Sequence, residues 1–282
     1  MSERKTLKEL TIKNNFMFGA VMMEEDNCKE LLELILQIPI ERVEVSKEKS
    51  IVYHPEYKGI RLDVYAKDDK NTHYNVEMQA TFKESLGKRA RYYHSQMDME
   101  LLSTGQEYEK LSNSYVIFIC DFDPFGKRKY CYTFANQCLE DVSLNQTDGS
   151  TSIFLSTKGE NVNEVSERLV KFLNYVKASR EESEKDFEDE FISKLQKSVQ
   201  NIKDSRAMEE RFMLFELMLK EERVAGKAEV LISLLEDLGE VSNELRDLIM
   251  SQVDSEIVMK WVKIAAKVET IEEFQKSISS EG

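Results

Sequence analysis

The sequence contains few of the residues on which many metal and disulfide sites depend. Only 3 His and 4 Cys occur among 282 residues, and no CxxC pair is present. We therefore expect four free thiols and neither a zinc site nor a histidine-rich metal site. The chain also lacks a run of about 18 or more apolar residues, and its first residues lack the apolar stretch of a secretory signal. These absences predict a cytoplasmic protein without a membrane-spanning segment.

Positive charge is also in deficit, with 39 Lys and Arg against 53 Asp and Glu and a formal net charge of −14. This balance argues against extensive nonspecific binding of nucleic acid, which uses many contacts between cations and phosphates. The charges are unevenly distributed, however. Residues 180–190 hold seven acids and two bases, whereas residues 83–94 hold four bases and one acid. An acidic chain can therefore still present one basic strip.

Hydrophobic periodicity divides the chain into two regions. Up to about residue 178, segments of helical periodicity alternate with β-type segments, and this order predicts an α/β fold with a mixed sheet flanked by helices. The expected helices are 14–37 (in two pieces), 83–107 and 162–176, and the expected strands are 41–53, 60–66, 73–80, 114–122, 129–135 and 151–156. Residues 179–282 predict an all-helical C-terminal region, with helices at 184–201, 206–237, 241–251 and 254–266. The apolar stripe of 207–238 needs a partner helix, so we expect this region to mediate self-association or regulation.

Two alternating segments flank a polar turn near residue 70 and predict a β-hairpin. If the turn is centred at residue 70, residues whose numbers sum to 140 face each other. Asp63 then lies opposite Glu77, and Arg61 lies opposite Gln79. Two opposed carboxylates repel unless a cation lies between them, and Mg²⁺ or Mn²⁺ suits oxygen ligands. The alternative is an ordinary solvated strand face, and a register slip of one residue would move Asp63 to the other face.

Several longer segments carry a family resemblance. Asp63 followed by Glu77-x-Gln79 resembles the PD-(D/E)XK nuclease signature, with Gln in place of the final Lys. The segments at 11–22 (TIKNNFMFGAVM), 89–98, 101–111, 114–126 (SYVIFICDFDPFG) and 153–161 resemble the recombination-promoting nuclease (Rpn) family, also called PD-(D/E)XK nuclease family transposases. The resemblance spans about residues 8–178, with a weaker match in the helical tail. It implies a restriction-endonuclease-like fold and a bacterial, Mg²⁺-dependent enzyme that cleaves DNA.

The resemblance also assigns roles to individual residues. It implies that Asp63 and Glu77 bind the metal, with the backbone carbonyl of Met78 as a third ligand and with Mn²⁺ or Ca²⁺ as alternatives to Mg²⁺. Gln79 stands where the usual lysine would be, and a neutral amide can orient the attacking water without deprotonating it. Asn14 stands near the start of the first helix, where family members often carry Asp. An Asn can ligate through its oxygen but brings no charge.

The basic strip lies on the helix predicted at 83–107, whose buried stripe includes Leu86, Ala90, Tyr93, Met97 and Leu101. Side chains beside this stripe are candidates for DNA contacts because cations and amides bind phosphate oxygens. The candidates are Lys88, Arg89, Arg91, Tyr92 and Gln96. The alternative for the lysines is an ordinary solvated helix face, and Tyr92 could equally be a core aromatic residue.

The sequence therefore predicts a metal-dependent DNA endonuclease that uses Asp63, Glu77 and Gln79 and associates with itself through its C-terminal helices. One alternative is a nuclease-fold protein with weak or no catalysis, acting as a DNA-binding or interaction module. Another is a defence-type toxin nuclease restrained by its helical tail, in which the acidic run at 180–190 competes with phosphate for the basic strip.

Overall fold

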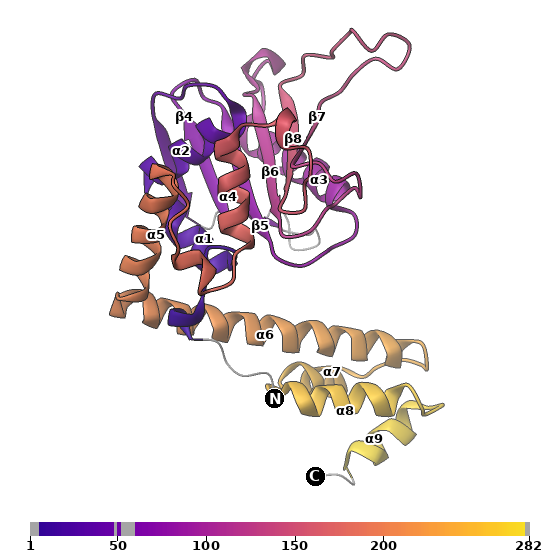
Figure 1. The fold of residues 1–282 in the computed structure, drawn as a ribbon. Helices are drawn as coiled ribbons and strands as arrows, with labels where there is room; N and C mark the ends of the chain where they lie inside the picture. The colour runs from indigo at the N-terminus through magenta and orange to yellow at the C-terminus, as the bar shows by residue number, and fades with distance from the viewer. Residues whose placement is uncertain (1–5, 48–49, 52–59, 280–282) are drawn as a thin grey trace. The chain divides into compact units, whose positions relative to one another are not determined.

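The computed structural model describes residues 6–47, 50–51 and 60–279. The chain forms two compact units, Met1–Ser205 and Arg206–Gly282. The first unit contains a six-stranded sheet with the strand order β1-β4-β5-β6-β8-β7 (Figure 1). These strands are β1 (Val43–Lys47), β4 (Val64–Asp68), β5 (His73–Gln79), β6 (Ser114–Cys120), β7 (Cys131–Phe134) and β8 (Ser150–Ser156). β5, β6 and β8 run parallel, and the other neighbours are antiparallel. The predicted mixed sheet is confirmed.

Helices cover both faces of this sheet (Figure 1). α3 (Leu86–Leu101) packs on one face through Leu86, Ala90, Tyr93 and Met97, which join a buried cluster with β6 and β8 residues. The predicted stripe is thus largely confirmed, although α3 ends six residues before the predicted limit of 107. The other face carries α1 (Asn15–Met22), α2 (Glu25–Leu36) and α4 (Glu167–Lys177). Short 3-10 turns lie at η1 (Leu7–Glu9), η2 (Tyr108–Lys110), η3 (Val162–Glu164) and η4 (Glu182–Glu184). Because both faces are covered, every residue of β5 is buried.

The β4–β5 hairpin has the predicted register. The paired residues are Val64 with Val76, Tyr65 with Asn75, Ala66 with Tyr74 and Lys67 with His73, and the numbers in each pair sum to 140. The regular ladder ends at the pair Val64–Val76 and therefore does not include Asp63, the residue that precedes Val64. The prediction of one continuous strand over 60–66 is wrong, because β3 (Ile60–Arg61) pairs with β2 (Ser50–Ile51) in a separate small sheet. The predicted pairing of Arg61 with Gln79 is therefore also wrong, since Arg61 pairs with Ser50.

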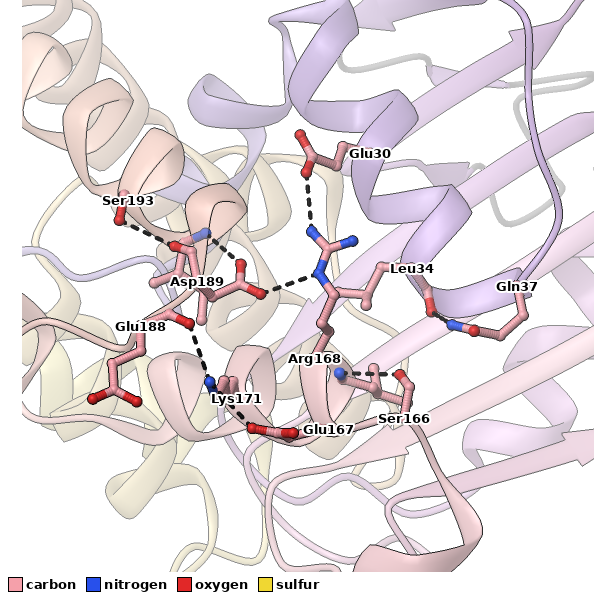
Figure 2. A network of polar contacts seen from close by, with 12 residues as sticks. Glu30, Leu34, Gln37, Ser166, Glu167, Arg168, Lys171, Glu188, Asp189 and Ser193 are labelled. Carbon is pink, nitrogen blue, oxygen red and sulfur yellow. Dashed lines mark hydrogen bonds and ion pairs between the residues drawn. The ribbon is translucent and has the colours of Figure 1, made fainter.

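α5 (Glu190–Lys203) belongs to the first unit, so the boundary between the compact units lies at Ser205, later than the expected residue 178. Arg168 on α4 links three elements (Figure 2): its guanidinium donates to Glu30 on α2 and to Asp189, both at 3.1 Å. Asp189 is the N-cap of α5 and also accepts from the Ile192 N–H. This network ties the start of α5 to α2 and α4.

The second unit consists of α6 (Arg206–Glu236), α7 (Asn243–Met250), α8 (Ser255–Ala265) and α9 (Ile271–Ser279). The all-helical region is confirmed, and α9 had not been predicted. Its apolar core joins the C-terminal part of α6 to the other three helices through Leu231, Leu235, Ile249, Val258 and Phe274. In the part of the chain that the structure describes, no helix is both long and apolar enough to cross a bilayer. The four cysteines are free, as predicted.

Candidate active site

Asp63 and Glu77 meet at the open end of the β4–β5 hairpin. The Asp63 N–H donates to Glu77 Oε1 at 3.2 Å, and the Met78 N–H donates to Asp63 Oδ2 at 3.3 Å. These two bonds hold the carboxylates side by side, although the ladder itself stops at Val64. Glu77 is 0% exposed, so an ordinary solvated strand face does not describe it. The structure thus brings together the two acids that the hairpin register had placed opposite each other.

A carboxylate buried this deeply requires compensating hydrogen bonds and charge. Glu77 Oε1 also accepts from the Asn75 side-chain amide at 3.3 Å, and Glu77 Oε2 accepts from Arg89 Nη2 at 2.5 Å. Burial raises the pKa of the Glu77 carboxyl above its ordinary value, and the Arg89 guanidinium acts against this shift. Asn75 was not among the predicted site residues. It lies two positions before Glu77 on β5, so the same alternation that predicted Glu77 places it on the same face.

Arg89 joins the metal-binding candidates to α3. Its Nη1 donates to Gln79 Oε1 at 3.2 Å, and its Nε donates to the Tyr93 hydroxyl at 2.6 Å. The guanidinium carbon lies 5.1 Å from the centre of the Tyr93 ring and 5.5 Å from that of Phe118. Gln79 is buried two residues after Glu77 on β5. Arg89, predicted as a DNA contact, is therefore part of the acidic site itself.

The start of α1 also reaches the site, through Asn15. Asn14 is the N-cap of α1, and its side-chain oxygen accepts from the N–H groups of Phe16 and Met17. Asn15 Nδ2 donates to Asp63 Oδ2 at 3.3 Å. The residue of the first helix that contacts Asp63 is thus the neighbour of the predicted one. When two asparagines stand next to each other at a predicted helix start, the sequence does not show which of them caps the helix.

The remaining DNA-binding candidates separate by exposure. Lys88 and Arg91 are exposed on α3, whereas Tyr92 is half-buried and packs against the hydrophobic cluster under the helix. Gln96 is 8% exposed and lies among the buried polar residues. Of the four bases in the predicted strip, Lys83, Lys88 and Arg91 are exposed, and Lys88 and Arg91 are the exposed ones among the DNA-binding candidates.

The residues at this site fit a hard divalent cation in ligand type, because the available donors are oxygens. The Met78 N–H points toward Asp63, and a residue in a strand directs its N–H and C=O to the same edge, so the Met78 carbonyl faces Asp63 as well. The side-chain oxygen of Asn75 is buried and makes no hydrogen bond within the described structure. In the described ranges no group of three or more His, Cys, Asp or Glu could hold a metal. Two carboxylates would therefore need carbonyl, water or phosphate oxygens to complete the shell.

A cavity of about 350 Å³ opens beside this site, at the carboxyl ends of β5 and β6. Its lining includes Lys13, Asn14, Ala80, Asp121 and Arg180. Lys13 forms an ion pair with Asp121 at 3.2 Å, and the Asp121 N–H donates to the Gln79 carbonyl at 2.9 Å. Sequence reasoning missed this cluster because its members come from distant segments. Ligands of α/β proteins often bind where strands end, and this cavity has that position in the sheet.

Comparison with known proteins gave one match to a family. Residues 12–223 match the family model described as PD-(D/E)XK nuclease family transposase. The match includes the hairpin, α3, all six strands of the main sheet and α5. Comparisons with curated proteins and with solved structures gave no significant match.

Proposed function

Because the chain belongs to the PD-(D/E)XK nuclease family transposases, we propose that it is a metal-dependent endonuclease that hydrolyses DNA phosphodiesters. The observation that carries the proposal is the contact between Asp63 and the wholly buried Glu77. Two adjacent acids, one of them wholly buried, repel each other, and a cation shared between them removes that repulsion. The described site also supplies the neutral oxygen donors that a hard cation prefers.

Each residue has a role in this proposal. Asp63, Glu77 and the Met78 carbonyl would hold Mg²⁺, for which Mn²⁺ or Ca²⁺ can substitute in ligand type. The bound ion would polarise the phosphate and lower the pKa of a water molecule. Gln79 orients that water through its amide, since a neutral amide cannot remove the proton. Lys88 and Arg91 bind phosphates flanking the scissile bond.

One observation favours a second candidate, a nuclease-fold protein that binds DNA without cleaving it. Arg89 already neutralises Glu77 at 2.5 Å, so the buried acid has a cation without a metal. If this pair were permanent, the site would be a structural ion pair. Such a protein would bind DNA with an affinity that falls with salt, and it would cleave no substrate in any divalent ion.

The arrangement of the first unit gives no support to direct blocking by the acidic run. Residues 180–190 lead into α5, which packs against α1 and α2, whereas the basic strip lies on α3 across the sheet (Figure 1). Self-association through the second unit is a proposal supported by half-exposed apolar residues on α6, namely Met213, Leu214, Leu217 and Met218. A monomeric mass of the full chain in light scattering would contradict it.

The proposed function predicts that the purified full chain nicks supercoiled plasmid in Mg²⁺ or Mn²⁺. EDTA should abolish nicking, and excess Mg²⁺ should restore it, because the carboxylates alone cannot activate water. The Asp63→Asn protein, purified in the same way, controls for contaminating nucleases. Salt-sensitive DNA binding without nicking would favour the second candidate.

The two asparagines at the start of α1 give a matched pair of variants. Asn14→Ala removes a helix cap and should lower the free energy of unfolding by about 1 kcal/mol. Asn15→Ala removes the hydrogen bond to Asp63 and should reduce nicking about tenfold, since groups that orient metal ligands have effects of this size. Asn15 is exposed, so its loss should change the unfolding temperature less than Asn14→Ala does. Equal nicking by Asn15→Ala and wild type would exclude this role for Asn15.

A further inference from the structure

Arg89 makes more contacts within the site than a surface DNA-binding residue requires. Its three nitrogens donate to Glu77, Gln79 and Tyr93, and its guanidinium lies near two aromatic rings. The side chain nevertheless remains 29% exposed, whereas Glu77 is fully buried. One end of this ion pair is therefore fixed in the interior, and the other borders solvent.

The two oxygens of Glu77 are used differently. Oε1 accepts from the Asp63 N–H and from Asn75, both held on the hairpin. Oε2 accepts from Arg89, which comes from α3. A divalent cation shared by Asp63 and Glu77 would need a Glu77 oxygen, and a guanidinium on the same carboxylate repels that cation at short range. The more easily vacated position is Oε2, because its partner side chain reaches solvent.

We propose that Arg89 is an internal counter-ion of the Asp63–Glu77 site: it leaves Glu77 when a divalent cation binds, and a DNA phosphate then receives its guanidinium. The inference rests on the proposed function and identifies what couples the metal to the substrate. A guanidinium suits the exchange, since it pairs with carboxylates and phosphates in the same forked geometry. Binding linkage requires that DNA and metal strengthen each other's binding by the same factor.

The test is Mn²⁺ binding to the full chain without DNA, measured by titration calorimetry or by the electron paramagnetic resonance of free Mn²⁺. Arg89→Met should bind Mn²⁺ about tenfold more tightly than wild type, because the ion no longer competes with a charge-assisted hydrogen bond. Arg91→Met is the matched control, since it removes the same charge from an exposed position of the same helix. Its Mn²⁺ affinity should equal that of wild type. Equal affinities in all three proteins, or equal tightening in both variants, would overturn the inference.

Arg89→Met leaves Glu77 buried without its cation and could fail to fold, so a second variant and a wild-type measurement are included. Arg89→Lys retains the charge but cannot donate to Glu77, Gln79 and Tyr93 together, and its Mn²⁺ affinity should lie between wild type and Arg89→Met. In wild type, a short DNA duplex should tighten Mn²⁺ binding, and a duplex with neutral methylphosphonate linkages should not. The proposal would be overturned if neither the charged duplex nor the Arg89→Lys substitution changed the Mn²⁺ affinity.

The outcomes distinguish the counter-ion role of Arg89 from the endonuclease activity. Metal-dependent nicking with Mn²⁺ affinity unaffected by Arg89 would leave the endonuclease assignment intact and remove only the counter-ion role. Absence of Mn²⁺ binding in wild type and in every variant would remove both.

Discussion

Asp63→Asn is expected to reduce plasmid nicking by about a hundredfold or more, because a neutral amide cannot supply the charge that holds a catalytic cation. The substitution preserves the shape of the side chain. The new amide oxygen can still accept from the Met78 N–H, which donates to Asp63 Oδ2 at 3.3 Å. Removing one of two adjacent acids also lessens their repulsion in the metal-free protein. We therefore expect an unfolding temperature equal to or higher than that of wild type.

Asp68 provides the matched control on the same strand. It lies at the turn end of β4 and accepts from the N–H groups of Lys70 and Thr72 and from the Tyr74 hydroxyl at 2.7 Å. Asp68→Asn should lower the free energy of unfolding by about 1–3 kcal/mol, because an amide replaces a charged acceptor. The folded fraction of this variant should nick plasmid at the wild-type rate.

Nicking rates and thermal unfolding of the two variants therefore distinguish a catalytic acid from a structural one. The expected pattern is lost activity with retained stability at Asp63 and the reverse at Asp68. Full nicking by Asp63→Asn, or a large loss of stability in that variant, would contradict the catalytic assignment.

The hairpin register could be predicted from the sequence because two constraints agreed. Alternating apolar residues fixed which side chains share a face, and the polar turn fixed the centre of pairing. Four observed pairs follow the predicted sum. The break after Arg61 could not be predicted, because Ile60 to Ala66 alternates without interruption. The break follows from the pairing of Arg61 with Ser50, a contact between segments that periodicity along one strand does not reveal.

In the candidate site, too, some features could be predicted from the sequence and others could not. The motif and alternation predicted Asp63, Glu77 and Gln79 as site residues, and the structure places Glu77 and Gln79 in the interior. The bond from Arg89 to Glu77 depends on how α3 lies across the sheet, and helical periodicity gives the face of a helix without giving its partner. The sequence alone therefore predicts that Arg89 is a solvent-exposed DNA contact. The long-range contacts of Asn15 and Lys13 depend in the same way on tertiary packing.

Acidification is expected to destabilise the first unit through His94. This side chain lies on α3 and is 7% exposed, with one ring nitrogen 2.8 Å from Ser114 Oγ and the other 3.1 Å from Ser152 Oγ. Burial lowers the pKa of His94 from 6.5 to about 4, and the nearby Asp148 carboxylate opposes this shift only in part. The folded protein therefore keeps His94 neutral at a pH where the unfolded chain protonates it.

The sign of the effect follows from which state takes up the proton first. Well above pH 6.5 His94 is neutral in both the folded and the unfolded chain, and the stabilisation is complete. As the pH falls from 6.5 toward 4, the unfolded chain gains a proton that the folded chain excludes, so stability declines by about 3 kcal/mol in total.

Urea unfolding of wild type and His94→Gln at a series of pH values between 7 and 4 measures this contribution. The Gln variant should be less stable at pH 7, because a single amide cannot reproduce both contacts to the serine hydroxyls. Its disadvantage should shrink as the pH falls, since Gln does not titrate. The difference between the two curves of stability against pH contains no contribution from the carboxyl groups, because both proteins share them. A stability difference that stayed constant across this range would mean that His94 takes up its proton equally in the folded and unfolded chains. A buried, neutral imidazole between Ser114 and Ser152 would then be the wrong description of His94.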